Sequence, residues 1–518
     1  MAMNGRKSAL VVLLCFNWVI GIVVARGIED YWSKRANLIH AEKKIAFGGD
    51  ISLTKNEMLT NRTLMSAKLK EIQEGFSDPN KFFPRANFLT VKNKIEKSKV
   101  FQIIKKMPKG ALLHAHDLGT VSHEFVLRNL TYRSDLYVCQ SEGGLKLMFF
   151  KTPGKNCHWE LLSELRNTPA KEIQINKRIL EEMTMMTDNP AKAYPDGDAA
   201  WAKFQSLFSF LFPFITYKPV FEDYFNQLLQ EIYDDKVLYL ELRTVLPDIF
   251  DLSGRVYKSL EVMQILNSLS QKFVAEHPDF LGIKIIYAPM RHLNQNELKK
   301  HIENAELIKE SFPEFLAGFD LVGHEEKGGT LREFAEQLQV LGQKMPFFFH
   351  AGETDWYGLS TDENLIDAVL LNAKRIGHGY ALLKHPKVME IVLEEKIAIE
   401  VNPISNQVLN LVDDLRNHPA SILFAENYPV VVSSDDPGLW GAKALSYDFY
   451  EAFMGLMSGS SDLRALKKLA INSLLYSTMS DKEQSKAIQI FQKQWEDFLL
   501  DVAEMENKEF RLSNNSVD

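Results

Sequence analysis

Four residues whose side chains commonly bind metal ions lie at the ends of short apolar stretches in this sequence. They are His114 and His116 in Ala-Leu-Leu-His-Ala-His, His350 in Pro-Phe-Phe-Phe-His, and Asp435 after Val-Val-Val-Ser-Ser. A metal ion that activates water for hydrolysis needs nitrogen and oxygen ligands held rigidly, with one position open for water. If the fold brings these four residues together, they form one such metal site.

Two further residues near these stretches could move or position protons. Glu353 lies three residues after His350 and could shuttle a proton beside a reactive water, although a carboxylate at a helix N-terminus is the plainer interpretation. His378 lies between two glycines in Arg-Ile-Gly-His-Gly-Tyr, and glycines allow another group to approach closely. It could orient or deprotonate a water, or it could be a hydrogen-bonded structural histidine.

The adjacent carboxylates Asp435 and Asp436 also favour a bound cation. Two neighbouring carboxylates repel each other when both are ionised, unless a cation takes one of them. One could then bind the metal while the other faces a substrate. The alternative is an Asx-type turn before Pro437.

The elements that position these residues are predicted to be short parallel strands. Eight β-rich stretches, most of them separated by segments with helical periodicity, cover residues 111–116, 237–242, 283–287, 317–322, 347–350, 375–378, 397–401 and 430–433. Buried strands alternating with helices indicate a parallel sheet. Eight of them predict an α/β fold, a closed (β/α)8 TIM-type barrel, with its active site at the C-terminal ends of the strands.

The first 25 residues have the pattern of a secretory signal peptide. Arg6 and Lys7 precede an apolar stretch over residues 9–25 that ends in Val-Val-Ala. A membrane anchor is the alternative, but the stretch is short for a span and contains Asn17. The pattern predicts cleavage after Ala25 and a secreted, extracellular protein without a membrane span.

Cysteines and glycosylation triplets agree with export. Cys139 and Cys157 remain after the predicted cleavage, and in an oxidising compartment they can pair, although two buried thiols are also possible. Asn-X-Ser/Thr triplets, which predict glycosylation in a secreted protein, begin at Asn61, Asn129 and Asn514.

We expect three regions after the signal peptide. Residues 26–107 read as a charged helical arm for packing or dimerisation, or as a plain N-terminal extension. Residues 108–505 contain the barrel. The interval between its first two strands is longer than a crossover helix needs, and residues 125–185 would form an insert stapled by Cys139 and Cys157.

Composition and motifs argue against three classes of protein. A net charge of −8 and a pI of about 6.0 do not suggest the basic face of a nucleic-acid-binding protein. Zinc deaminases of nucleic-acid bases carry H-x-E with P-C-x-x-C, which this chain lacks. Dinuclear barrel hydrolases often use a modified lysine, and residues 318–323 offer none, so one metal ion is expected.

Taken in order, the motifs resemble those of the adenosine deaminase family. They are H-A-H-D, F-D-L-V-G-H-E, H-A-G-E-T-D-W, R-I-G-H-G-Y, P-I-S-N-Q-V and S-S-D-D-P. The signal peptide, the arm and the cysteine-bearing insert are similar to the extracellular branch, the adenosine deaminase-related growth factors or adenosine deaminase type 2. The resemblance covers almost the whole mature chain, about residues 30–505.

The resemblance implies a metal, a reaction and a set of substrate contacts. One Zn²⁺ per chain would be held by His114, His116, His350 and Asp435. His378 would steer the attacking water onto C6 of the purine, and Glu353 would protonate N1. Asp436 would bond N7, and the backbone of Gly323 would meet N3. Adenosine and 2′-deoxyadenosine would give inosine and 2′-deoxyinosine with ammonia.

One motif departs from the wider family. Adenosine deaminases outside this branch carry H-x-H-L-D-G, whereas here His116 is followed directly by Asp117. The carboxylate that meets the ribose is therefore shifted by one position. Asp117, Trp201 and Trp356 are candidates for the ribose pocket, with core packing as the alternative for Trp201.

The resemblance also implies partners: a second copy of the chain bound through the arm, and a cell-surface receptor or glycosaminoglycan bound by the insert, with possible growth-factor activity. Two alternatives remain. One is a secreted growth factor or binding protein that acts without catalysis, and the other is a deaminase of another purine, such as AMP or adenine.

Overall fold

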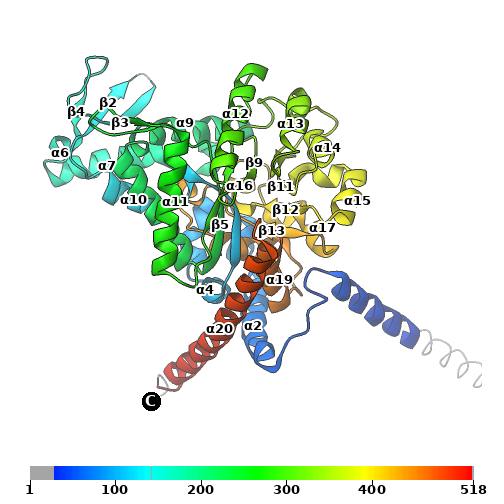
Figure 1. The fold of residues 1–518 in the computed structure, drawn as a ribbon. Helices are drawn as coiled ribbons and strands as arrows, with labels where there is room; N and C mark the ends of the chain where they lie inside the picture. Colours follow the sequence, from blue (N-terminus) through cyan, green and yellow to red (C-terminus); the bar gives the residue numbers. More distant parts are fainter. Residues whose placement is uncertain (1–27, 142, 516–518) are drawn as a thin grey trace, which may run out of the picture.

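Eight parallel strands surround the centre of the molecule as two four-stranded sheets (Figure 1). The computed structural model describes residues 28–141 and 143–515, and side chains as far as residue 508, so the predicted signal peptide lies outside the described residues. One sheet has the order β1 (Gly110–His116), β5 (Val237–Thr244), β8 (Ile283–Tyr287) and β9 (Leu316–Phe319). The other has the order β10 (His350–Ala351), β11 (Arg375–His378), β12 (Ala398–Val401) and β13 (Val430–Val432).

Isolated parallel bridges join the two sheets on both sides. Phe319 pairs with Phe347 at one junction, and Ala115 pairs with Asp435 at the other. At the second junction the Asp435 N–H donates to the His114 carbonyl, and the His116 N–H donates to the Asp435 carbonyl, each at 3.1 Å. The strands thus continue around a ring, and the predicted TIM-type barrel is confirmed.

The strands are apolar because helices cover the outside of the ring. All eight residues of β5 are buried, as expected for a parallel sheet packed on both faces. Each outer helix turns one apolar face to the strands; in α11 the buried residues recur every three or four positions, from Val262 to Phe273. The outer helices are α10 (Lys218–Asp234), α11 (Ser259–Glu276), α12 (Gln295–Ser311), α13 (Ala335–Leu341), α14 (Asn364–Leu370), α15 (Pro386–Glu394), α17 (Ala420–Ala425) and α19 (Leu463–Leu475).

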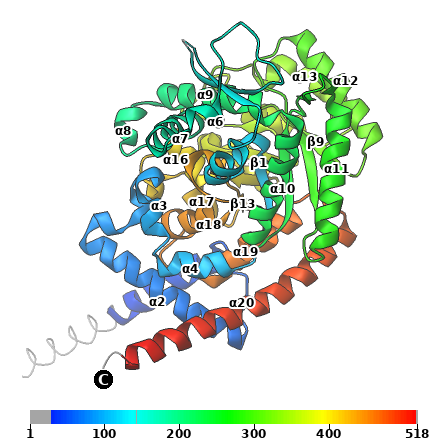
Figure 2. The same ribbon diagram turned by 90° about the vertical axis from the view of Figure 1, so that its left-hand side faces the viewer.

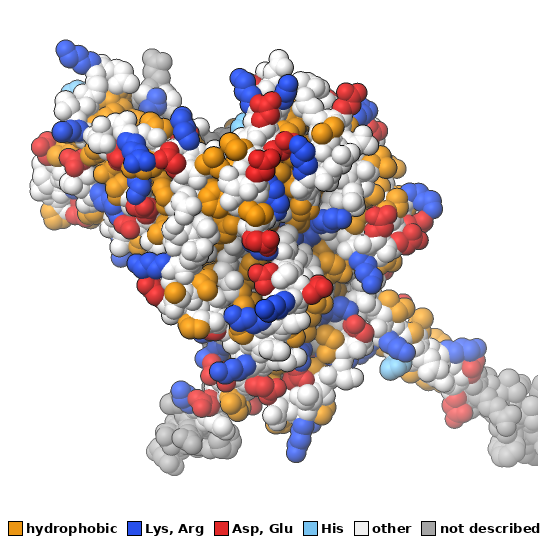
Figure 3. Space-filling model, viewed as in Figure 1, with side chains coloured by type: hydrophobic (Ala, Val, Ile, Leu, Met, Phe, Trp, Pro, Cys, Tyr) orange, Lys and Arg blue, Asp and Glu red, His pale blue; other side chains and the backbone are white. Residues whose placement is uncertain are grey.

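Helices from both ends of the chain pack together below the barrel (Figure 2). They are α2 (Lys55–Ser77), α4 (Lys99–Lys106) and α20 (Asp481–Asn515), while α3 (Phe88–Ile95) packs against α16 (Pro403–Val408). The buried Glu57 carboxylate accepts a hydrogen bond from the Trp495 indole at 2.9 Å, which fixes α2 against α20. A further helix at residues 28–45 projects from the body, with hydrophobic side chains visible along it (Figures 1 and 3).

The region between β1 and β5 contains the expected insert. Three antiparallel strands in the order β3 (Gly144–Phe149), β2 (Leu136–Ser141) and β4 (Glu160–Leu161) are followed by α6 (Leu162–Leu165) and α7 (Pro169–Met183). The predicted Cys139–Cys157 disulfide is present. The insert packs on α9 (Gly197–Ile215), which returns the chain to the barrel.

Short elements complete the fold. These are β6 (Ile249–Phe250), β7 (Val256–Tyr257), α5 (His123–Phe125), α8 (Pro190–Ala193), α16 (Pro403–Val408) and α18 (Ser446–Glu451). Within the described ranges, no helix has the length and apolar character needed to cross a bilayer.

Candidate metal centre and its cavity

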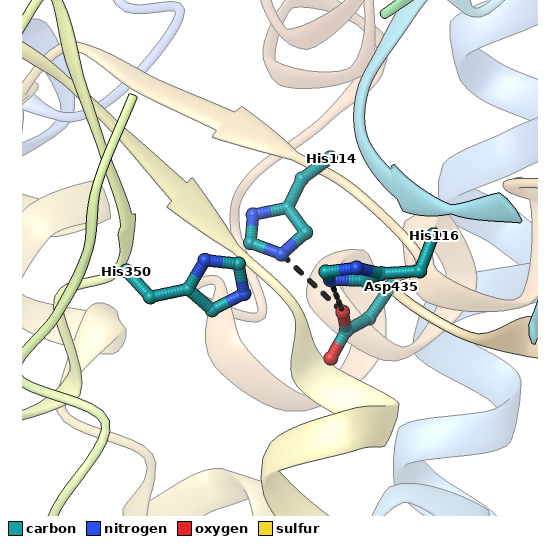
Figure 4. Close-up of side chains that lie close together, drawn as sticks. All are labelled: His114, His116, His350 and Asp435. Carbon is teal, nitrogen blue, oxygen red and sulfur yellow. Dashed lines mark ion pairs between the residues drawn. The ribbon is translucent and has the colours of Figure 1, made fainter. Parts of the chain in front are cut away.

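The four predicted metal ligands converge at the mouth of the barrel (Figure 4). His114 and His116 point the same way because alternate residues of β1 share a face. The Nε2 atoms of His114 and His116 lie 3.3 Å and 3.0 Å from Asp435 Oδ1. The His350 ring centroid lies 4.5 Å from that of His114. One ligand atom from each residue lies within 4.8 Å of the others.

The chemistry of this cluster fits a divalent metal ion. His114 Nε2 is buried and has no hydrogen-bond partner, while its Nδ1 lies 2.7 Å from Glu400 Oε2. Burial lowers the pKa of His350 to about 3, so this imidazole is neutral, as a metal ligand must be. Three nitrogens and a carboxylate oxygen form a donor set suited to Zn²⁺.

Buried carboxylates orient two of the imidazoles from behind. Glu400 faces His114 Nδ1, and Asp320 Oδ2 lies 2.6 Å from His350 Nδ1. Arg243 links these carboxylates by donating to Asp320 and to Glu400, each at 2.8 Å. Burial alone would raise the pKa of the Glu400 carboxyl, but Arg243 and Arg375 hold it well below its usual range. Outer partners of this kind fix the orientation and tautomer of ligand histidines.

Sequence reasoning missed this outer layer. The available signal was the presence of charged residues inside otherwise apolar strands: Glu241 and Arg243 in β5, and Glu400 in β12. A charge at a fully buried strand position needs a partner. That rule predicts that such partners exist, but it does not identify them.

Glu353 and His378 lie on the open side of the metal cluster. His378 Nδ1 is 3.4 Å from Glu353 Oε1, and His378 Nε2 is 3.8 Å from Asp435 Oδ2. Glu353 is 4% exposed, and its Oε1 has no hydrogen-bond partner. Burial, with the charges of Asp435 and Glu325, raises the pKa of Glu353 well above its usual range. Glu353 is therefore suited to carry a proton near neutral pH.

The pKa values of Asp435 and Asp436 are shifted in opposite directions. Burial alone would raise the pKa of Asp435, but the neighbouring imidazoles of His114 and His116 lower it well below its usual range. Burial and the neighbouring Asp435 raise the pKa of Asp436 well above its usual range. Asp436 Oδ1 is buried without a partner. Asp435 thus has the character of a ligand, and Asp436 can donate a hydrogen bond.

A cavity of about 520 Å³ joins these groups, a size suited to a small-molecule ligand. Predicted site residues that line it are His116, His350, Asp435, Asp436, Glu353, His378, Gly323, Asp117 and Trp201. Trp201 stacks on His324 with ring centroids 4.5 Å apart. The lining also includes the apolar residues Phe204, Phe208, Phe212, Val245, Pro247 and Met290.

Trp356 is not among the residues that line this cavity. Its side chain is 55% exposed, and its indole N–H donates to Glu326 at 3.2 Å. Its backbone N–H donates to the Thr354 hydroxyl at 3.1 Å. The loop after β10 therefore turns this tryptophan outward, and the structure does not bring it to the other predicted ribose residues.

The chain is similar to known proteins over most of its length. A family model described as "Adenosine deaminase" matches residues 177–493, and one described as "Adenosine/AMP deaminase N-terminal" matches residues 15–104. An adenosine deaminase from Phlebotomus duboscqi is 45% identical, with 94% of each chain covered. Adenosine deaminase 2 from Homo sapiens is 43% identical, with 90% of this chain and 93% of the human protein covered.

A solved structure shares the fold at low sequence identity. An amidohydrolase from Burkholderia ambifaria with bound Zn is 16% identical and superposes with a TM-score of 0.53. The match covers 78% of this chain and 95% of that chain.

Proposed function

The chain belongs to the adenosine deaminase family, and we propose that it is a secreted, Zn²⁺-dependent enzyme that deaminates adenosine and 2′-deoxyadenosine to inosine and 2′-deoxyinosine. The observation that carries this proposal is the meeting of the metal cluster with Glu353 and Asp436 in one cavity. These groups match the needs of a hydrolytic deamination: a ligand set, a proton donor and a second hydrogen-bond donor.

His114, His116, His350 and Asp435 would hold one Zn²⁺, as a metal of this kind is bound in the related-fold amidohydrolase. When bound, Zn²⁺ lowers the pKa of water so that it can attack near neutral pH. His378 lies beside Asp435 and would orient the attacking oxygen toward C6 of the purine.

Two buried acids would bind and activate the purine ring. Glu353 would donate its proton to N1, which draws electrons from C6 and makes that carbon electrophilic. Asp436 would donate to N7. The water oxygen becomes the C6 carbonyl oxygen; one water proton leaves with the amino group as ammonia, and the other restores the proton that Glu353 gives to N1, so atoms and charge balance.

The remaining contacts would place N3 and the ribose. Gly323 has φ of +100° and lines the cavity, and its backbone would meet N3. Asp117 and Trp201 line the same cavity and would meet the ribose. Trp356 is not included because it faces away.

Secretion and assembly form the second part of the proposal. The disulfide of the insert and the exposed position of Asn129 support an extracellular protein with a glycan at that residue. The Asn61 amide instead donates to Asp462 at 3.1 Å and accepts from the Leu463 N–H at 3.0 Å, so a glycan there would compete with these contacts. The side chain of Asn514 lies outside the described residues.

The exposed helix at residues 28–45 supports dimerisation through the arm. Its apolar side chains Tyr31, Trp32 and Leu38 are 58%, 57% and 65% exposed and need a partner surface. On the insert, the exposed residues Lys146, Lys151 and Lys155 suit a polyanionic glycosaminoglycan. Growth-factor activity would follow from adenosine removal or from such a contact.

The test uses full-length protein purified from culture medium. Loss of ultraviolet absorbance on adenosine and zinc content are measured on the same sample. About one zinc per chain with conversion to inosine supports the proposal. Full zinc occupancy without turnover contradicts it, and a panel with 2′-deoxyadenosine, AMP and adenine would then separate another purine deaminase from a catalytically idle binding protein.

A further inference from the structure

A buried series of hydrogen-bonded side chains lies behind His378 and ends at its Nδ1 atom. The Asn406 side-chain amide lies 3.1 Å from His378 Nδ1. The other side of Asn406, Oδ1, lies 2.9 Å from His418 Nε2. His418 Nδ1 in turn accepts a hydrogen bond from the Ala420 backbone N–H at 3.1 Å. All three side chains are at most 2% exposed.

The Ala420 backbone N–H at the far end of this series determines where each proton in it lies. An amide N–H can only donate, so His418 Nδ1 must be an acceptor. Burial lowers the pKa of His418 to about 3, so the neutral ring carries its proton on Nε2. This N–H donates to Asn406 Oδ1, and the oxygen of that amide must therefore face His418.

The same reasoning determines the tautomer of His378. With Asn406 Oδ1 facing His418, the Asn406 NH₂ group faces His378 and donates to Nδ1. Nδ1 must hold a lone pair, and the proton of the neutral His378 ring is placed on Nε2. Nε2 is the nitrogen that lies 3.8 Å from Asp435 Oδ2, in a ring that lines the cavity.

We propose that Asn406 and His418 are positioning residues that hold His378 as its Nε2–H tautomer. This inference rests on the proposed function, because His378 matters through the deamination carried out beside it. In the resting enzyme His378 then donates a hydrogen bond toward the attacking oxygen. A ring held this way directs the oxygen and cannot accept its proton at Nε2.

Two other groups near His378 do not select the tautomer in the same way. The Asn402 amide nitrogen lies 3.5 Å from both ring nitrogens, so it approaches the ring without distinguishing them. Glu353 Oε1 lies 3.4 Å from Nδ1, farther than the Asn406 amide, and makes no hydrogen bond. An ionised Glu353 would favour a proton on Nδ1, which is the rival arrangement that an experiment must exclude.

The direct test is ¹⁵N NMR of the zinc-loaded full-length protein labelled at histidine. The chain has 13 histidines, and the His378 signals are assigned by their loss in His378→Asn. We expect an unprotonated Nδ1 and a protonated Nε2. A protonated Nδ1 overturns the inference. The measurement requires no turnover, so it remains decisive even if adenosine is not the substrate.

Variants separate positioning from simple packing. Asn406→Asp keeps an acceptor for His418 but replaces the donor to His378, so the His378 proton should move to Nδ1. We expect kcat to fall by about 100-fold with KM changed less than about threefold, as for outer-layer partners of a reactive site. Asn402→Asp adds the same charge against the same ring and should leave the tautomer unchanged.

His418 provides a matched pair of variants. His418→Phe keeps a ring against Tyr380 but cannot donate to Asn406, so the amide is free to turn over. We expect a mixture of His378 tautomers and kcat lowered about tenfold. His418→Gln retains an amide donor and should restore both properties. A His418→Phe protein with a pure wild-type tautomer, or an Asn406→Asp protein with wild-type kcat, overturns the inference.

Discussion

Substitution of Glu400 by glutamine should weaken zinc binding although Glu400 is not a metal ligand. Glu400 Oε2 faces His114 Nδ1 at 2.7 Å and accepts from Arg243 at 2.8 Å, while Oε1 accepts from Arg375 at 2.6 Å. Every neighbour is a donor. Glutamine supplies one oxygen, so its NH₂ group must face a donor on one side.

The magnitude follows from which contacts survive. Loss of an outer partner of a ligand histidine costs about 10–100-fold in metal affinity, or about 1.4–2.7 kcal/mol. Removing one partner of a buried ion pair costs about 3–5 kcal/mol of stability. Arg243 keeps Asp320 and Arg375 keeps Glu241, so we expect the lower end, about 3 kcal/mol.

Glu241→Gln is the matched control for this substitution. Glu241 binds Arg375 at 2.6 Å and the Thr478 N–H at 2.6 Å, but it contacts no metal histidine. The Glu241→Gln variant should be less stable than the wild type and should bind zinc with the wild-type affinity. Zinc Kd is measured by competition with a chromophoric chelator, and stability by urea unfolding of the metal-free protein. Equal zinc affinity in Glu400→Gln and wild type, or equal losses in both variants, would refute the orientation argument.

Three further outcomes are expected. Glu353→Gln should lower kcat for adenosine by about 10²–10⁴-fold while zinc content stays at the wild-type value, because the proton donor is lost but no ligand is changed; retained activity would exclude Glu353 as the donor. Burial lowers the pKa of Lys68 from 10.5 to about 7, so the unfolded chain binds more protons between these values and the free energy of unfolding rises with pH across that window. Lys68→Met should reduce this rise in urea titrations at pH 7 to 10, and an unchanged slope would contradict the assignment. Replacing Cys139 and Cys157 by serine opens a loop with a sequence separation of 18 and should cost about 3 kcal/mol; calorimetry should show this loss with unchanged kcat, since neither residue lines the cavity.

Strand positions could be predicted closely from the sequence because buried parallel strands are runs of apolar residues. The expected strands at 283–287 and 375–378 agree with β8 and β11. The stretch at 347–350 fared less well: Phe347 makes only an isolated bridge, and the assigned strand β10 is His350–Ala351. The sequence shows that a stretch of apolar residues is buried, but the hydrogen bonds to neighbouring strands determine at which residue the strand begins.

Site residues could be predicted where a chemically reactive side chain lies at the end of a strand, and less well elsewhere. Polar residues that end apolar runs are visible in one dimension, as with His114 and Asp435. Pairs such as His350 with Asp320, or His378 with Asn406, join separate strands or loops, and no local pattern encodes them. Trp356 illustrates the limit for loops, because its direction depends on the hydrogen bonds to Thr354 and Glu326.

The backbone at the site supports a functional reading of two residues. His378 and Asp435 have φ of +61° and +59°, a left-handed conformation that costs a residue other than glycine about 1–3 kcal/mol. His378 is the last residue of β11 and Asp435 lies three residues after β13, and there the turn aims the side chain into the barrel mouth while the chain leaves the sheet. Backbone hydrogen bonds between Asp435 and β1 hold that conformation in place. Glycine would relieve the strain but would remove the imidazole or the carboxylate. Eight other described residues besides glycine also have positive φ, so the strain alone does not identify the site; at His378 and Asp435 it falls where the proposed chemistry needs a side chain.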